Sequence, residues 1–222
     1  MRTTALLDLD GTLVDTNYHH ALAWYRAFRE QGILLPVWRI HRHIGMGGDQ
    51  IVKALTDNDV ESRLGDRLRE GKENEFRAMR DECEPLHGAA ELVRELHRRS
   101  IATILASSAG QDDLDHFLSI LGVEELIDGW TTSDDVERSK PHPDIVHAAL
   151  AKVEQPGHAI MIGDSRWDIE AGARAGLETI CVLTGGWSSQ ELVDAGALAV
   201  YESLPELIRG LDGTPLGPGP SR

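Results

Sequence analysis

Two aspartates lie at the end of the first apolar run of this 222-residue chain. The run Ala5–Leu9 contains Asp8 and leads into Asp10, and Gly11 then allows a sharp turn of the backbone. A carboxylate in apolar surroundings costs several kcal/mol unless a cation or hydrogen bonds compensate it. Two such groups could bind a cation, attack an electrophile or transfer protons. The plain alternative is a turn cap. A calcium loop fits less well, because its glycine stands at the sixth position and Gly11 stands fourth from Asp8.

Polar residues that could join this pair follow other apolar runs. They are Ser107 and Ser108 after Ile101–Ala106, Asp164 and Asp168 after Ala159–Ile162, and Lys140 in a loop before a helix. Ligands bind at the carboxyl ends of the strands in an open parallel sheet, so these residues can converge. Four carboxylates and one lysine repel one another on balance unless a dication is present. The chain lacks a matching set of histidines or cysteines for zinc, and oxygen ligands favour magnesium.

A site of this composition could bind a phosphate group. Magnesium and the Lys140 ammonium would attract a phosphate dianion. Its oxygens could accept hydrogen bonds from the hydroxyls of Thr12 and Ser107 and from N–H groups after Asp10. An aspartate carboxylate can also serve as a nucleophile and form an aspartyl-phosphate. These residues therefore indicate phosphoryl-transfer chemistry.

The elements around these residues predict an α/β fold. Continuous apolar runs separated by helices are typical of a parallel sheet covered on both faces. We expect strands at Ala5–Leu9, Ile101–Ala106, Ile127–Thr131, Ala159–Ile162 and Thr179–Leu183, and a last strand and helix between Leu198 and Ile208. We expect helices at Gly88–Arg99, Asp112–Leu121, Pro143–Val153 and Arg166–Ala175.

Residues 15–87 carry helical patterns only. Parallel strands are normally joined by a crossover of about a dozen residues, and far more lie between Leu9 and Ile101. We therefore expect a helical cap domain over 15–87, inserted into an α/β core of 1–14 and 88–212. Its helices are expected at Asp15–Arg29 and from Asp49 through Leu55, with a charged amphipathic region Asn58–Cys83 that Gly65 and Gly71 could break into pieces. Residues 213–222, with three prolines, are expected to form a disordered tail.

Composition narrows the classes of partner. The formal net charge of −15 argues against a nucleic acid or an anionic membrane as partner, since both are polyanions. The two cysteines, Cys83 and Cys181, make no disulfide framework and are expected to pack inside a cytoplasmic protein. The first apolar run is too short for a signal peptide, and no run approaches the ~20 apolar residues of a membrane span. The sequence leaves a monomer and a homodimer equally open.

Segments of this chain resemble the four motifs of the haloacid dehalogenase (HAD) superfamily, in the same order and with similar gaps. The segments are Asp8-Leu9-Asp10-Gly11-Thr12, Ser107, Lys140 and Gly163-Asp164-Ser165-Arg166-Trp167-Asp168. The helical insertion resembles the cap of the subfamily that contains phosphoglycolate phosphatases and β-phosphoglucomutases. The resemblance implies a Rossmann-like core with a helical cap and a magnesium-dependent phosphatase that acts on a small phosphomonoester.

The resemblance also implies a role for each motif residue. Asp8 would attack phosphorus and bind magnesium. Asp10 would protonate the leaving oxygen and then activate water, while its backbone carbonyl ligates the metal. Asp164 would be the other metal ligand, and Asp168 would orient Lys140 or a metal-bound water. The phosphoryl group is expected to contact Gly11, Thr12, Ser107, Ser108 and Lys140.

Other activities of the superfamily are tested by single positions. Haloalkanoate dehalogenases and phosphonate-cleaving members lack an aspartate two residues after the nucleophile, and Asp10 is present here. A phosphomutase remains an alternative, because His20 resembles the mutase histidine near the acid/base aspartate. Mutases, however, carry a glutamate where this chain has Gly163 and a cap-loop arginine where it has Gly47-Gly48. A non-catalytic phosphate-binding scaffold is the third reading, although such a module needs no pair like Asp8 and Asp10.

Contacts to the leaving group are expected from the cap. The candidates are His20, Arg42, His43, Gly45, Gly47 and Lys53. The loop from Ile44 to Gln50 is expected to face the core site, since caps of the family place a loop there. The plain alternatives are a helix connector for the glycines, solvated side chains for the basic residues and a helix-surface position for His20.

Overall fold

Six strands form one parallel sheet in the computed structural model of the protein, which describes residues 2–217. The strands are β1 (Arg2–Leu7), β2 (Ala102–Ala106), β3 (Gly129–Thr131), β4 (Pro156–Gly163), β5 (Glu178–Val182) and β6 (Ala199–Tyr201). Their order in the sheet is β3-β2-β1-β4-β5-β6, so the first strand of the chain lies in the middle. Leu6 of β1 pairs with Ile104 of β2 on one side and with Met161 of β4 on the other. The carboxyl ends of these three strands therefore lie side by side.

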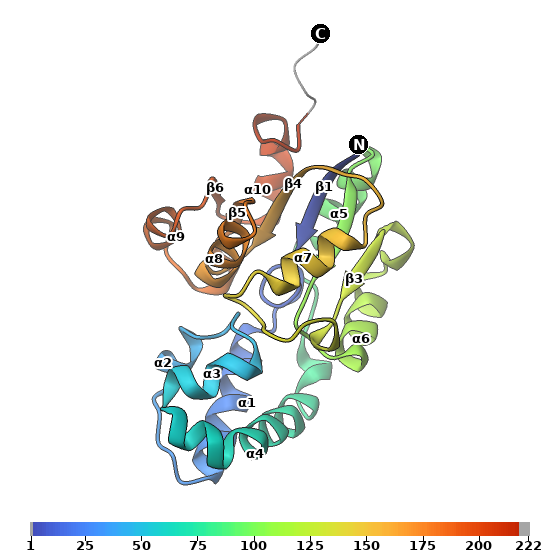
Figure 1. The fold of residues 1–222 in the computed structure, drawn as a ribbon. Coiled ribbons are helices and arrows are strands. Elements are labelled where there is room, and N and C mark those ends of the chain that lie inside the picture. Colours follow the sequence, from blue (N-terminus) through green and yellow to red (C-terminus); the bar gives the residue numbers. More distant parts are fainter. Residues whose placement is uncertain (1, 218–222) are drawn as a thin grey trace.

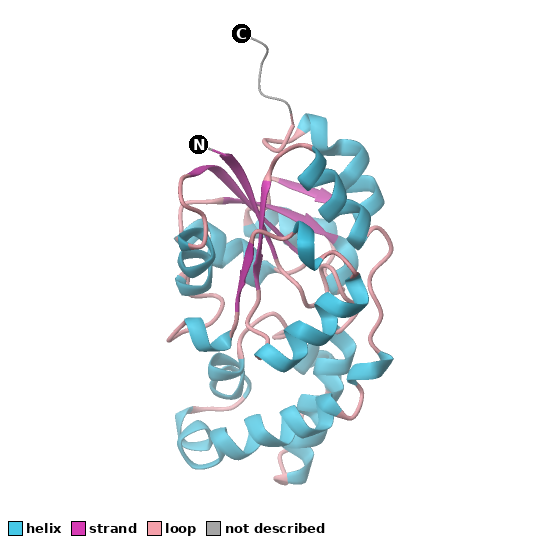
Figure 2. Ribbon diagram, turned by 90° about the vertical axis from the view of Figure 1, so that its right-hand side faces the viewer, coloured by secondary structure: helices cyan, strands magenta, loops and turns pink. Residues whose placement is uncertain are grey.

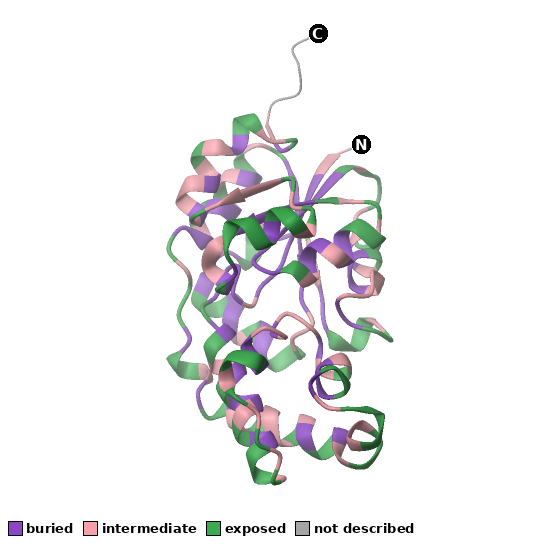
Figure 3. Ribbon diagram, turned by 90° about the vertical axis from the view of Figure 1, so that its left-hand side faces the viewer, coloured by how far each residue is buried: buried purple, intermediate pink, exposed green. Residues whose placement is uncertain are grey.

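Helices cover both faces of the sheet (Figures 1 and 2). On one face lie α5 (Ala89–Arg98), α6 (Gln111–Leu121) and α10 (Leu204–Gly210), and on the other α7 (Asp144–Ala151), α8 (Arg166–Arg174) and α9 (Ser189–Ala195). Alternation along the strands divides the core, because successive side chains point to opposite faces. Leu7 packs in the cluster with α5 and α6, whereas Leu6 packs in the cluster with α7 and α8. Figure 3 shows the middle of the sheet buried between helices whose outer faces are exposed. The predicted α/β class with a parallel sheet is confirmed.

Four helices form a separate layer beyond the carboxyl end of the sheet (Figure 1). They are α1 (Asn17–Glu30), α2 (Val37–His41), α3 (Gly48–Leu55) and α4 (Asn58–Arg77), and they enclose an apolar cluster of their own that includes Phe28 and Leu68. The expectation of breaks at Gly65 and Gly71 is wrong, since α4 is one helix of 20 residues. Gly71 lies against α1, where an added Cβ would stand 3.3 Å from the Cβ of Ala27. The close packing of α1 on α4 offsets the ~1 kcal/mol that a glycine costs in a helix interior.

The chain passes between the two layers twice, at neighbouring places. The N–H of Asp15 donates to the carbonyl of Glu84 (3.0 Å), and the N–H of Leu86 donates to the carbonyl of Leu13 (2.9 Å). We propose that these paired crossings mark the ends of the inserted cap, which gives it residues 15–87.

Two further parts of the chain differ from the sequence-based expectation. The short helix α9 was not predicted, and it begins at a capping box in which Ser188 and Glu191 bond to each other's backbone N–H groups. The predicted disordered tail is wrong for 213–217, because Leu216 is 1% exposed and packs in the core cluster with α5 and α10. The rest of that predicted tail, 218–222, lies outside the described residues. Within 2–217 no helix has the length and apolar character that crossing a membrane would require.

Candidate active site

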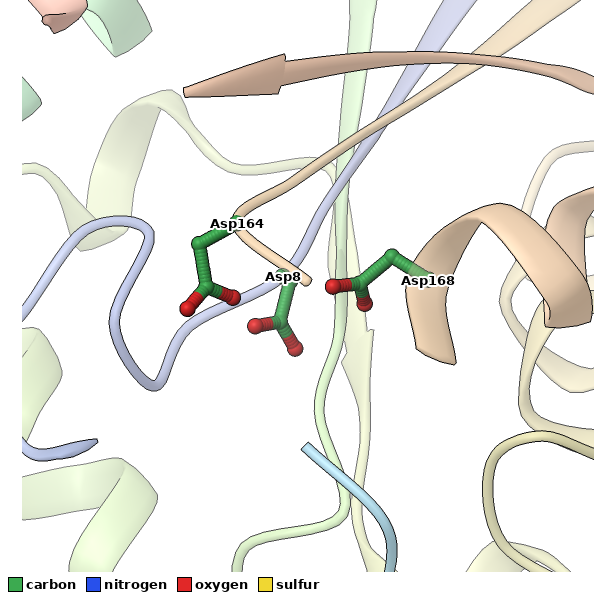
Figure 4. A group of neighbouring side chains, drawn as sticks. All are labelled: Asp8, Asp164 and Asp168. Carbon is green, nitrogen blue, oxygen red and sulfur yellow. The ribbon is translucent and has the colours of Figure 1, made fainter. Parts of the chain in front are cut away.

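Three carboxylates meet at the carboxyl end of the sheet (Figure 4). Asp8 directly follows β1, Asp164 directly follows β4, and Asp168 lies in the first turn of α8. One oxygen from each lies within 4.8 Å of the others, and all three residues are buried. The switch in strand order around β1 produces this convergence, as open α/β sheets generally do.

Lys140 lies among these carboxylates. Its Nζ donates to Oδ1 of Asp8 and forms an ion pair with Oδ1 of Asp168 at 2.7 Å, and the residue is 2% exposed. Burial lowers the pKa of Lys140, but the charges of Asp168 and Asp8 raise it further, so the pKa lies above its ordinary value. Oδ2 of Asp168 accepts from the N–H and the hydroxyl of Ser165. Asp168 thus fixes both the start of α8 and the lysine.

Three carboxyl groups outnumber the one ammonium, so full ionisation would leave two net negative charges in a buried cluster. Burial raises the pKa of Asp8 to about 7, and Asp168 and Asp10 raise it too, against the lowering effect of Lys140. Burial, followed by the charges of Asp168 and Asp8, raises the pKa of Asp164 well above its usual range. A divalent cation would relieve this repulsion, and a donor set made only of oxygen fits magnesium better than zinc. The residues present therefore fit the predicted ion.

Neighbouring polar side chains orient the carboxylates. The amide Nδ2 of Asn17 donates to Oδ2 of Asp164 at 2.6 Å. The hydroxyl of Thr12 lies 3.3 Å from Oδ2 of Asp8 and 3.4 Å from Oδ1 of Asp164, within reach of either. Gly11 has a φ of +77°, and its carbonyl accepts from the Thr184 hydroxyl. Gly11 thus shapes the turn and Thr12 lies within reach of two carboxylates, and their contact with phosphate stays a prediction.

Asp10 points away from this cluster, toward the cap. Its Oδ1 accepts from the hydroxyl of Thr16 at 2.7 Å and lies 2.9 Å from Nε2 of His20, whose ring stacks on Phe76 at 3.9 Å. Burial raises the pKa of Asp10, but His20 and Thr16 lower it more, to about 2. Burial, and then the charge of Lys72, lowers the pKa of His20. The pair therefore places a carboxyl group and an imidazole 2.9 Å apart, an arrangement that can take up and release a proton.

A cavity of about 460 Å³ lies between the two layers and reaches Asp8, Asp10 and Lys140. This volume is typical of sites for small organic molecules. The predicted residues His20, Gly45, Gly47 and Ser108 also line it. Ser107 is buried and absent from the lining, and its Oγ accepts from the N–H of Ala109.

The cap loop contacts the core directly beside this cavity. The N–H of Gly47 donates to the carbonyl of Lys140 at 3.4 Å, and Asp49 Oδ2 accepts from the N–H of Ser139 at 3.1 Å. Gly47 is needed here, since an added Cβ would overlap the side chain of Ser139.

A family model described as haloacid dehalogenase-like hydrolase matches residues 3–176, a segment that holds all four motifs and the whole helical layer. The chain belongs to the haloacid dehalogenase-like hydrolases. The family resemblance inferred from the motifs is thereby confirmed.

Individual relatives agree with this membership. Pyrophosphatase PpaX of Oceanobacillus iheyensis is 28% identical over 190 residues, which cover 85% of each chain. Validoxylamine A 7'-phosphate phosphatase of Streptomyces hygroscopicus subsp. limoneus is 27% identical, over 89% of this chain and 93% of that protein. The crystal structure of a hydrolase from Pseudomonas syringae superimposes with a TM-score of 0.89 at 35% identity, over 96% of this chain and 99% of that one.

Three residues predicted to touch the leaving group lie elsewhere in this HAD-like hydrolase. Arg42 pairs with Glu191 and lies over the ring of Trp187, 3.4 Å from its centroid. The Nδ1–H of His43 donates to the backbone carbonyl of Arg39 at 2.9 Å, and Lys53 is exposed. None of the three lines the cavity, which corrects the expectation. Positive charge near the loop is their only signal in the sequence, and Arg42 instead contacts Trp187 and Glu191 of the core.

The cavity wall that the sequence did not reveal comes from α4. Arg69, Lys72, Glu73 and Phe76 line the cavity together with Trp24 of α1 and Met46 of the loop. Their signal in the sequence is a mixed stripe at positions i, i+3, i+4 and i+7, which is difficult to distinguish from a solvated helix face. Asn17, the partner of Asp164, also gave no signal, since it reads as an ordinary first helical residue.

If Asp164 binds magnesium, Asn17→Ala is expected to weaken that binding about 10-fold, because outer hydrogen-bond partners of metal ligands typically contribute that much. Without the amide, one oxygen of Asp164 loses its donor and the carboxylate loses its orientation. The magnesium concentration for half-maximal activity measures the change. Asn74→Ala, on the exposed side of α4, is the matched control. An unchanged magnesium requirement would reduce Asn17 to an anchor for α1.

Proposed function

We propose that this hydrolase is a magnesium-dependent phosphatase that cleaves a small phosphomonoester through an aspartyl-phosphate. The observation that carries the proposal is the position of Asp8, which faces the cavity between the buried ammonium of Lys140 and the carboxylate of Asp164. Two relatives bear the names pyrophosphatase and phosphatase, which support the same class of reaction.

The proposed reaction has two steps. A carboxylate oxygen of Asp8 attacks phosphorus, the bond from phosphorus to the leaving oxygen breaks, and Asp10 gives that oxygen a proton. Asp10, now a carboxylate, takes a proton from a water molecule that attacks the aspartyl-phosphate. The bond between phosphorus and Asp8 then breaks, which releases phosphate and restores Asp8. Lys140 stays protonated throughout and neutralises charge on the transferring group.

Magnesium would be held by the carboxylates of Asp8 and Asp164 and by the backbone carbonyl of Asp10. When bound, the ion neutralises charge on the phosphoryl oxygens and on the cluster itself. Asp168 already bonds to Ser165 and Lys140, so its proposed role is to position the lysine.

Packing around Gly163 speaks against a phosphomutase. A Cβ added at this glycine would stand 2.6 Å from Oδ2 of Asp168. The glutamate of mutases therefore cannot occupy position 163 while Asp168 keeps its bonds to Ser165. Asp168, which pairs with Lys140, occupies the space that the side chain of such a glutamate would need.

The function is tested by phosphate release from a panel of phosphoglycolate, hexose 1-phosphates, nucleotides and glycerol phosphates. We expect release from at least one substrate, its loss with a chelator and its return with added magnesium. Conversion of a hexose 1-phosphate to the 6-phosphate without free phosphate would instead identify a mutase. Binding of a panel member with no turnover would identify a scaffold.

His20→Gln is expected to lower kcat about 10-fold and to move the acidic limb of the pH–rate profile to higher pH. Protonated His20 lowers the pKa of Asp10, so without it the effect of burial dominates and the pKa rises. In the second step Asp10 must be ionised to take a proton from water, so when that step limits kcat the rate begins to fall at a higher pH than in the wild type. His147→Gln, at an exposed position of α7, should leave the limb in place. If the acidic limb of the pH–rate profile lies at the same pH in both variants as in the wild type, His20 does not lower the pKa of Asp10.

A further inference from the structure

The backbone that carries Lys140 has little structure of its own. Lys140 lies in a segment without helix or strand, 136–143, which leads into α7. Among the described residues, a single backbone hydrogen bond joins two members of this segment, from the N–H of His142 to the carbonyl of Ser139 at 3.0 Å. From the core, Arg174 of α8 donates to the carbonyl of Pro141 at 2.7 Å. The segment therefore takes its position from groups outside it, and the Lys140 ammonium takes its position from the segment.

The cap supplies the hydrogen bonds that lie nearest the lysine. Asp49, in the first turn of α3, accepts from the N–H of Ser139 through Oδ2 at 3.1 Å, and the N–H of Gly47 donates to the carbonyl of Lys140 at 3.4 Å. Gln50 donates to the same oxygen of Asp49 at 2.6 Å and so orients the carboxylate. Ser139 is 8% exposed, and a buried N–H that loses its acceptor is costly. Asp49 therefore fixes the backbone immediately before the lysine.

The same cap loop packs on the group that holds the lysine side chain. Asp168 pairs with Nζ of Lys140 through Oδ1, and its Oδ2 accepts from the hydroxyl of Ser165 at 2.6 Å. Gly45 lies against this hydroxyl at a φ of +95°, and an added Cβ would stand 2.8 Å from Oγ of Ser165. Residues 45–49 thus contact both the backbone of the lysine and the support of its side chain.

We propose that Asp49 is a positioning residue of the cap, which sets the place of the Lys140 ammonium through its hydrogen bond to Ser139. This inference rests on the proposed function, in which Lys140 neutralises charge on the transferring phosphoryl group. Such a preorganised charge is effective only where the charge develops, and a small displacement of it lowers the rate strongly. The cap therefore contributes to the reaction through the backbone of the lysine segment, at a place separate from any contact with the leaving group.

The test compares three variants. Asp49→Ala removes the acceptor of the Ser139 N–H, and Asp49→Asn keeps an amide oxygen that can accept it. Asp59→Ala removes an exposed acidic residue from the first turn of α4 and is the matched control for the loss of one from the first turn of α3.

Two measurements are made on each variant. Amide hydrogen exchange of Ser139, followed by NMR without substrate, reports the hydrogen bond, and Asp49→Ala should exchange at least about 10-fold faster than the wild type. With the best substrate of the phosphate-release panel, kcat and kcat/KM of Asp49→Ala should both fall at least about 10-fold. Asp49→Asn should stay close to the wild type in both measurements, and Asp59→Ala should change neither.

Each other outcome contradicts a stated part of the argument. Unchanged exchange at Ser139 in Asp49→Ala would overturn the inference, and so would faster exchange with an unchanged kcat, since the lysine would then keep its place without the hydrogen bond. An equal loss of kcat in Asp49→Asn would overturn it because the charge of Asp49 would then matter, and an equal loss in Asp59→Ala would do so because any cap helix would then have this effect. In all these cases the wild type still releases phosphate. Absence of release by the wild type from every substrate would instead contradict the proposed function.

Discussion

Asp8→Asn lowers the rate of phosphate release at least about 10⁴-fold, in the range observed when other enzymes lose a covalent nucleophile. The amide cannot attack phosphorus, while its size and its place at the end of β1 are unchanged. The substitution also removes one of three crowded carboxylates whose repulsion and burial raise the pKa of Asp8 to about 7. The metal-free variant should therefore unfold at a temperature no lower than the wild type. Phosphate release under saturating substrate and thermal unfolding without magnesium measure the two effects.

The control for Asp8→Asn is Asp59→Asn, in the first turn of α4, where the side chain is 73% exposed. It should retain full activity. Radiolabelled phosphate from the substrate should appear on the protein in the wild type after an acid quench, and it should be missing in Asp8→Asn. A variant that still turns over at a substantial fraction of the wild-type rate would remove Asp8 as the nucleophile, and the phosphatase mechanism with it.

Lys140→Met should cause the second large loss, and it should affect folding as well as turnover. Removing one partner of a buried ion pair costs about 3–5 kcal/mol, because the other charges stay behind without compensation. Here Asp8 and Asp168 both lose their bonded cation. In a chain of this size the expected fall in Tm is about 10 °C. Turnover should fall about 10³-fold, since the transferring phosphoryl group loses a preorganised positive charge.

A double variant distinguishes the structural part of this loss from the chemical part. Lys140→Met combined with Asp168→Asn removes one negative charge with the positive one and should recover much of the Tm, while turnover stays low. Lys152→Met, a half-exposed lysine paired with Asp135, serves as the control. If Lys140→Met unfolds at the wild-type temperature, Lys140 does not compensate the buried charges of Asp8 and Asp168.

Much of the fold could be predicted because burial leaves a strong signal in the sequence. The runs that became β1, β2 and β4 are apolar on both faces, and the polar residues after them were correctly placed near one another. The spacing between Leu9 and Ile101 was sufficient to indicate the inserted helices. In each case the prediction uses only the residue types and the length of the segment itself, and not the residues that pack on it in the fold.

The errors arose where partners distant in the sequence decide the outcome. Gly71 is helical because Ala27 packs on it. Leu216 is buried because it packs in the core cluster with α5 and α10. Its charge and its place near the cap loop predict that Arg42 contacts the leaving group. In the structure Arg42 instead contacts Trp187 and Glu191, which are distant in the sequence. Lys72 could not be separated from other lysines of the cap until the cavity was known.

The paired crossings between the layers bear on how such a protein changes over time. The backbones of Leu13 and Leu86 are hydrogen-bonded to each other, so the proposed cap would enter and leave the core at neighbouring points without a change in strand order. Substitutions on the cap side, away from its contacts with Ser139 and Lys140, can then alter which compounds are accepted. The apparatus around Asp8 and Lys140 would be inherited intact, which lets selectivity diversify on a fixed reaction.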